Sequence, residues 1–225
     1  MIAQIEISNN LSAKLRVDGQ EKSVPMVELT NILSNMITED ESPWLPNNLI
    51  YLRRDGGNVG AVYFFPETKT SYRYYDNSYD VILPPALFFF TLTALKNDKF
   101  KIVKMAAALT DSYNMQSSRL YQFPFPNNSL GYGPGFCWGS DRIAKDMYDK
   151  QCTLEQLPIL YQRFFAAQGN GDLGWKVQGS LEGKEACAKM LKLGKEGWTK
   201  QKVEETFCSI SLKKISEALY FDFTR

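Results

Sequence analysis

The chain has 225 residues, 44% hydrophobic and 13% aromatic, a composition that can fill a sizeable core and excludes an intrinsically disordered chain. Its 26 Lys and Arg against 25 Asp and Glu give a formal net charge of +1, without the positive excess that binding a phosphate backbone needs. We therefore expect no nucleic-acid partner. No apolar run approaches the roughly 18 residues that span a bilayer, and no secretory signal opens the chain, so we expect no membrane partner and a cytoplasmic location.

The first 48 residues are predicted to form an amino-terminal extension. Apolar residues at 5 and 7, and again at 13, 15 and 17, alternate with polar ones around a turn at 8–10, which indicates a β-hairpin. Apolar residues between Leu29 and Met36 recur at helical spacing, so a helix is predicted next. Residues 38–48, rich in acidic residues, Ser, Pro and Asn, are predicted to link this extension to a single core over 49–225.

Short apolar and aromatic runs separated by turn residues dominate the first half of that core. Residues 49–53, 61–65 and 71–75 are predicted to form an antiparallel meander, because Gly- and Pro-containing turns separate them. Residues 86–95 and 100–107 are predicted to form a further hairpin. The run at 86–95 is apolar almost throughout, which leaves a buried helix open as the alternative.

The second half of the core is predicted to be helical. Thr153 and Gln156 have the spacing of a capping box in front of an apolar stripe, and Leu212, Ile215 and Leu219 repeat at helical spacing near the end. Strands first and helices second is the order of an α+β fold. We therefore predict an antiparallel sheet followed by helices that pack mainly on one of its faces.

The chain contains no histidine, which excludes Ser-His-Asp triads, Cys-His dyads and His-ligated metals. Its four cysteines, at 137, 152, 187 and 208, form no C-x-x-C pair and no cluster, so we expect no metal and no cofactor. Cys187 shares an apolar helical stripe with Met190 and Leu191 and is expected to be buried. Ordinary burial is also expected to make Cys152 and Cys208 inert thiols.

Residues 119–141, RLYQFPFPNNSLGYGPGFCWGSD, join the predicted sheet to the predicted helices. Three prolines and four glycines exclude regular structure, and the aromatic residues indicate a loop packed onto the body of the protein. Ser140 and Asp141 place Cys137 just ahead of a predicted helix, whose amino terminus stabilises a nearby thiolate. Cys137 is therefore the candidate nucleophile, with a buried structural thiol as the alternative.

The same segment carries a family resemblance. Phe125-Pro126-Asn127, a glycine-containing stretch and Gly135-Phe136-Cys137 resemble the His-Pro-Asn…Gly-x-x-Cys active-site signature of ubiquitin-conjugating enzymes, with Phe125 in place of the histidine. The pattern is more similar to divergent prokaryotic members, in particular the protein B family of the plasmid-borne PRTRC system. The likeness covers roughly residues 49–175 and includes Leu83-Pro84-Pro85 and the Phe164-Phe165…Gly171-Asp172-Leu173 stretch.

The resemblance implies a ubiquitin-conjugating-enzyme-like fold and a specific reaction. Cys137 would accept the carboxyl-terminal glycine of a ubiquitin-like protein as a thioester, supplied by a ThiF-type adenylating enzyme, and pass it to an amine. Asn127, or Asn128 as second choice, would donate to the oxyanion formed during attack. Asp141 and Asp172, chosen by their proximity in sequence, are candidates to help deprotonate the amine.

Other interpretations are kept beside this one. A catalytically inactive scaffold or interaction protein of a mobile-element or defence system would retain the fold without the chemistry, which the missing histidine favours. A histidine-free cysteine hydrolase ranks lower, because no general base is visible. Asn127 and Asn128 could simply form the turn after Pro126. The Gly-rich segment at 169–174 lacks the features of a P-loop and is expected to be a surface turn.

Overall fold

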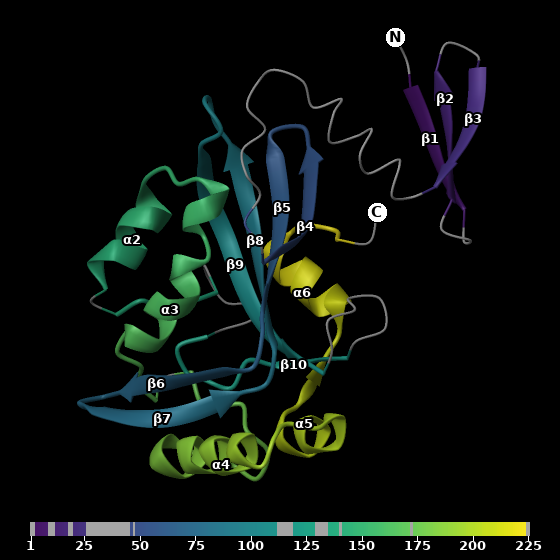
Figure 1. Ribbon diagram of the computed structural model, residues 1–225. Helices are drawn as coiled ribbons and strands as arrows, with labels where there is room; N and C mark the ends of the chain where they lie inside the picture. Colours follow the sequence, from purple (N-terminus) through teal and green to yellow (C-terminus); the bar gives the residue numbers. More distant parts are fainter. Residues whose placement is uncertain are drawn as a thin grey trace. The chain divides into compact units, whose positions relative to one another are not determined.

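The computed structural model describes residues 3–8, 12–17, 20–25, 46, 48–111, 119–128, 135–139, 141–171 and 173–223 (Figure 1). The chain divides into two units, Met1–Trp44 and Leu45–Arg225. The helix predicted between Leu29 and Met36 lies outside the described residues, as does all of the predicted 38–48 linker except Pro46 and Asn48. The candidate site belongs entirely to the second unit.

The amino-terminal unit contains a three-stranded antiparallel sheet in the order β1-β2-β3. β1 (Ala3–Ser8) pairs with β2 (Ser12–Val17), which confirms the predicted hairpin, and β2 also pairs with β3 (Gln20–Pro25). Sequence periodicity does not predict the third strand, because its residues QEKSVP show no alternation of apolar and polar side chains.

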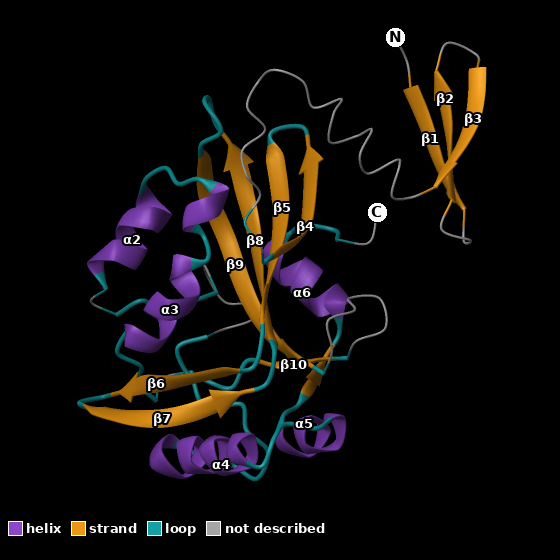
Figure 2. Ribbon diagram, in the orientation of Figure 1, coloured by secondary structure: helices purple, strands orange, loops and turns teal. Residues whose placement is uncertain are grey.

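The second unit is built on a six-stranded antiparallel sheet in the order β11-β10-β9-β8-β5-β4 (Figure 2). Along the described part of this unit, the first helix comes after seven of the eight strands, so the α+β class with an antiparallel sheet is confirmed. The strands of this sheet are β4 (Leu49–Asp55), β5 (Asn58–Phe65), β8 (Ala86–Ala94), β9 (Phe100–Thr110), β10 (Leu120–Gln122) and β11 (Ser209–Ile210).

The predicted meander is correct for its first two strands and wrong for the third. The strand predicted at 71–75 is part of β6 (Thr68–Tyr74), which pairs only with β7 (Asn77–Leu83) in a separate two-stranded sheet. The chain leaves the main sheet at Pro66, which follows β5 and has no N–H to continue a ladder. β8 then returns to pair with β5 along its whole length.

β8 is a strand, so the predicted hairpin of residues 86–95 and 100–107 is confirmed and the helical alternative is wrong. Its side chains are apolar on both faces because both faces of the sheet are covered. Phe88 and Phe90 belong to the larger core, whereas Leu87 and Phe89 belong to a second core on the opposite face. An apolar run that is almost continuous is therefore what this strand requires.

Helices cover the sheet on both faces, which corrects the expectation of one covered face. Ala144 of α2 and Leu160 of α3 enter the larger core, and Ile215 and Leu219 of α6 enter the opposite one (Figure 2). The buried α6 residues confirm the predicted helical stripe there. The helices are α2 (Arg142–Asp149), the short 3-10 helix η1 (Leu154–Gln156), α3 (Ile159–Ala166), α4 (Gly183–Lys195), α5 (Lys200–Thr206) and α6 (Leu212–Leu219).

Two smaller features complete the second unit. Thr153 and Gln156 form the predicted capping box, in which the Thr153 N–H donates to Gln156 Oε1 at 2.9 Å, although the first turn is 3-10 rather than α-helical. α4 packs against β7, where a Cβ at Gly194 would lie 2.3 Å from Ile82 Cβ. Among the helices in the described ranges, none has the length and apolar character needed to cross a bilayer.

Candidate functional site

The two described parts of the 119–141 segment pack into the larger core through aromatic side chains. Phe125 is fully buried, with its ring centroid 4.2 Å from that of Tyr72 and 5.6 Å from that of Phe164. Phe136 stacks on Phe88 at 5.5 Å and meets the edge of Phe164 at 5.0 Å. These contacts hold the residues on either side of Cys137 and Asn127 against the sheet and α3.

Two glycines with positive φ flank Cys137. Gly135 has a φ of +91°, and a Cβ there would lie 1.7 Å from the carbonyl oxygen of Met105 in β9. Gly139 has a φ of +51° and lies close to the Gln168 carbonyl oxygen. The backbone of Gly135 therefore packs directly on β9, an approach that no other residue allows.

A short backbone ladder joins the two halves of the segment. A single antiparallel bridge pairs Asn128 with Phe136, and the Cys137 N–H donates to the Asn127 carbonyl oxygen at 2.9 Å. Asn127 itself lies in a turn closed by the Asn128 N–H and the Phe125 carbonyl oxygen. Cys137 is exposed and reduced, so an accessible thiol sits beside a buried asparagine on a backbone held in place.

Asn127 is 2% exposed, and its amide is held by one specific contact. The Tyr72 hydroxyl donates to Asn127 Oδ1 at 2.8 Å, and among the described residues Asn127 Nδ2 has no hydrogen-bond partner. Burial raises the pKa of Tyr72 well above its usual value, with smaller contributions from Cys187, Tyr74 and Cys137. The Asn127 amide nitrogen is therefore a donor without a partner among the described residues, on the residue whose backbone carbonyl oxygen accepts from the Cys137 N–H.

Asn128 is also buried, but its amide is oriented differently. Its Nδ2 lies 3.5 Å from the Phe123 carbonyl oxygen, while its Oδ1 has no partner among the described residues. The free atom of this side chain is an acceptor, which cannot stabilise a developing negative charge. Of the two asparagines singled out in the sequence, Asn127 is the one whose amide nitrogen has no partner among the described residues.

Asp141 is the N-cap of α2. Its Oδ1 accepts from the Ala144 N–H at 2.9 Å, and its Oδ2 lies 3.6 Å from Arg163 Nε on α3. Cys137 thus lies four positions before the N-cap residue, just ahead of a helix as the sequence predicts. Because both carboxylate oxygens have partners, Asp141 fixes the helix to the loop. The other carboxylate considered, Asp172, lies outside the described residues.

The remaining cysteines differ from one another in exposure. Cys187 is buried on α4, as predicted, and burial raises the pKa of its thiol to about 12. Cys152 is buried too, and burial raises its pKa to about 11 against the opposing effect of Lys99. Cys208 is exposed, so the expectation of ordinary burial is wrong at this position. It follows α5 and directly precedes β11, an edge strand of two residues.

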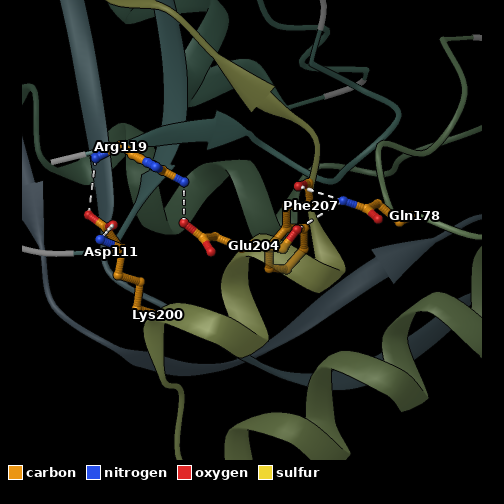
Figure 3. A network of polar contacts seen from close by, with 6 residues as sticks. All are labelled: Asp111, Arg119, Gln178, Lys200, Glu204 and Phe207. Atoms are coloured by element: carbon orange, nitrogen blue, oxygen red, sulfur yellow. Dashed lines mark hydrogen bonds and ion pairs between the residues drawn. The ribbon is translucent and has the colours of Figure 1, made fainter.

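A polar network holds the start of the segment (Figure 3). The Arg119 N–H donates to Asp111 Oδ1 at 3.1 Å, and the Arg119 guanidinium pairs with Glu204 on α5. Lys200 lies 3.9 Å from the second Asp111 oxygen. Gln178 Nε2 donates to the carbonyl oxygens of Glu204 and Phe207, so the network connects the ends of β9 and β10 to the carboxyl-terminal part of the unit.

Tyr72 and Trp138 are site residues that sequence reasoning missed. Tyr72 lies on β6, 55 residues before its partner Asn127, and no local pattern connects the two. Trp138 is 6% exposed, stacks on Phe136 and has an indole Nε1 without a partner among the described residues. The one feature of the sequence that could have pointed to Trp138 is its place directly after Cys137, within the segment that Gly135 and Gly139 bound.

The Gly-rich segment at 169–174 is also more than the surface turn that was expected. Gly169 forms a parallel bridge with Tyr74 and exchanges backbone hydrogen bonds with β6, accepting from Tyr75 and donating to Arg73. It therefore covers the end of the strand that carries Tyr72.

Comparisons with known protein families, curated proteins and solved structures found no match.

Proposed function

We propose that this protein carries a ubiquitin-like protein as a thioester on Cys137 in a prokaryotic conjugation pathway. The observation that supports this most is the pairing of an exposed thiol with Asn127, a buried asparagine whose amide nitrogen has no partner in the described chain. Acyl transfer needs both a nucleophile and a donor for the oxyanion.

The reaction would proceed by two acyl exchanges. The Cys137 thiolate attacks the carbonyl carbon of the glycyl adenylate held by a ThiF-type adenylating enzyme. A C–S bond forms, the acyl C–O bond to the phosphate breaks, and AMP leaves. An amine then attacks the thioester, a C–N bond forms, and Cys137 leaves as the thiolate. The carbonyl oxygen carries negative charge in both steps, so one donor serves both.

Asn127 is the residue proposed to stabilise that charge. Its Nδ2 has no partner among the described residues and its backbone carbonyl oxygen accepts from the Cys137 N–H, whereas the atom of Asn128 without a partner is an acceptor. Phe125, at the position of the histidine in the resembled signature, is anchored by Tyr72 and Phe164 and supports the turn without a polar side chain. The absence of histidine is therefore compatible with a rigid loop.

No general base is assigned in this mechanism. Asp141 uses both carboxylate oxygens within the loop–helix junction. The attacking amine would lose its proton to solvent, because a thiolate is a good leaving group and the reaction does not depend on protonating it. We expect the rate of transfer to rise with pH until the amine is fully deprotonated.

The test is reconstitution with an adenylating enzyme, ATP and a ubiquitin-like protein, read on gels with and without thiol reductant. Wild type should form a reductant-sensitive adduct, and Cys137→Ser should form a more stable oxyester instead. Asn127→Ala should still be charged but should transfer to an amine about 10²–10³-fold more slowly. Cys208→Ala, which removes the other exposed thiol, should behave as wild type.

The alternative is a non-catalytic scaffold of a mobile-element or defence system. The near-complete burial of Asn127 and its contact with Tyr72 also suit an asparagine that only builds the loop. A wild-type protein that never forms a reductant-sensitive adduct with a demonstrably active partner set would establish this alternative in place of the enzyme.

A further inference from the structure

The hydroxyl of Tyr72 is placed to decide which way the Asn127 amide points. Tyr72 is fully buried, and its hydroxyl lies 2.8 Å from Asn127 Oδ1. If the amide were rotated by half a turn, its NH₂ group would face the hydroxyl, and the buried O–H would have to find another acceptor. Among the described residues, Asn127 Oδ1 is the acceptor that this hydroxyl has.

The position of that hydroxyl is itself constrained on several sides. A Cβ at Gly169 would lie 1.8 Å from the Tyr72 oxygen, so the glycine backbone closes over it. Backbone hydrogen bonds at 2.8 and 2.9 Å hold Gly169 to Tyr75, which directly follows β6, and to Arg73 on β6. The ring is packed between Phe125, at 4.2 Å, and the edge of Trp175, at 5.7 Å.

We infer that Tyr72 is a positioning residue that keeps the Asn127 NH₂ group free for the oxyanion at Cys137. The inference rests on the proposed acyl-transfer function of Cys137. Tyr72 does not touch the reacting atoms and acts through Asn127. Since burial raises its pKa, the hydroxyl stays protonated at neutral pH and remains a donor to the amide oxygen.

The test needs no conjugation partner. A synthetic acetyl-Gly-Gly thioester of mercaptoethanesulfonate exchanges with Cys137: the cysteine sulfur attacks, a new C–S bond forms, and mercaptoethanesulfonate leaves as its thiolate. Added glycinamide then attacks the acyl-cysteine, forms the amide and releases the Cys137 thiolate. Intact mass of the full chain, in a Cys208→Ala background, follows both steps at one exposed thiol among the described cysteines.

The matched control for Tyr72→Phe is Tyr79→Phe. Tyr79 lies opposite Tyr72 in the β6–β7 ladder, is only partly buried, and its hydroxyl has no hydrogen-bond partner among the described residues. Tyr72→Phe should lower the maximal rate of aminolysis about tenfold without changing the half-saturating concentration of amine, because one buried hydrogen bond is lost and the amine site is intact. Tyr79→Phe should leave both values unchanged.

A double-mutant cycle separates positioning from a general structural effect. In an Asn127→Ala background, adding Tyr72→Phe should produce no further loss, since the two residues act on one donor. The side-chain amide resonance of Asn127 should shift in Tyr72→Phe and not in Tyr79→Phe. An equal tenfold loss in both backgrounds, an unshifted amide resonance, or a Cys137 that never acylates would overturn the inference.

These results are distinguishable from a failure of the proposed function. A protein that shows the Tyr72–Asn127 coupling with the synthetic thioester but accepts nothing from an active adenylating system would keep the positioning role and lose the conjugation pathway. If the adenylating system charges Cys137 but aminolysis is insensitive to Tyr72→Phe, the conjugation pathway is kept and the positioning role of Tyr72 is lost.

Discussion

The backbone N–H of Cys137 donates to the carbonyl oxygen of Asn127 at 2.9 Å, and this hydrogen bond closes the loop on which the candidate site is built. It places Cys137, whose thiol is exposed, beside the buried Asn127, although a glycine-rich stretch separates the two residues in sequence. The loop ends are held by aromatic packing, so the pairing does not depend on long flexible side chains.

Thiol reactivity should divide the cysteines into two classes. Limited alkylation at neutral pH, read by peptide mass spectrometry, should label Cys137 first, with Cys208 as the only other competitor among the described cysteines. Cys152 and Cys187 should be labelled only after unfolding, because burial raises the pKa of both thiols. Labelling of Cys187 in the folded protein as fast as Cys137 would contradict the burial of α4.

Stability should fall at alkaline pH. The pKa values of about 11 for Cys152 and about 12 for Cys187 lie above their ordinary value of 9.0, so the unfolded chain loses these protons first. The contribution of these two thiols to the free energy of unfolding is fully present below pH 9.0, and it is lost as the pH rises through their pKa values in the folded protein. Urea unfolding across this range should give a smaller slope for Cys187→Ala than for wild type. Cys208→Ala, at an exposed position, should keep the wild-type slope.

Gly135 should tolerate no side chain. Gly135→Ala places a Cβ 1.7 Å from the Met105 carbonyl oxygen and also forces a positive φ, so we expect a loss of about 3 kcal/mol or more in the free energy of unfolding. Gly174→Ala is the matched control, because its φ is +65° but nothing lies within 4 Å. That variant should cost only the backbone strain, about 1–2 kcal/mol. Equal losses in urea unfolding would show that the packing on β9 is unimportant.

Asp141 should act as a cap and not as a base. Asp141→Asn keeps an oxygen for the Ala144 N–H but removes the negative charge that faces Arg163. The rate of acyl transfer from the Cys137 thioester to an amine should therefore stay within about twofold of wild type. Asp141→Ala should lower the free energy of unfolding by about 1 kcal/mol through loss of the cap. A loss of transfer of about 10²-fold or more in Asp141→Asn, with stability unchanged, would assign it the proton-transfer role instead.

Local patterns in the sequence were enough to predict much of the secondary structure. Alternation predicts the β1–β2 hairpin, apolar runs on either side of turn residues predict the β8–β9 hairpin, and helical spacing predicts the buried face of α6 with Ile215 and Leu219. The same spacing predicts that Cys187 is buried. These elements follow from the pattern of apolar and polar residues within one segment, because that pattern shows which face of the segment is apolar.

Which partner covers an apolar surface was decided only by the tertiary structure. Residues 71–74 of the predicted 71–75 run form a strand, but nothing local shows that β6 pairs with β7 outside the main sheet, or that α6 covers the face opposite α3. The exposure of Cys208 has the same origin, since it depends on what packs around α5 and β11. Whether a side chain is buried depends on its own element and on the element that packs against it, and a local sequence pattern describes only the first of these.

The candidate site divides in the same way. Proline and glycine content, together with the cysteine, identified the 119–141 loop and Cys137 from the sequence alone, and the resemblance to a known active-site signature pointed to Asn127. The choice of Asn127 over Asn128 as the donor, the capping role of Asp141 and the contact from Tyr72 required the folded chain. A hydrogen bond between residues 55 positions apart leaves no periodic trace, because its geometry is set by how β6 packs on the loop.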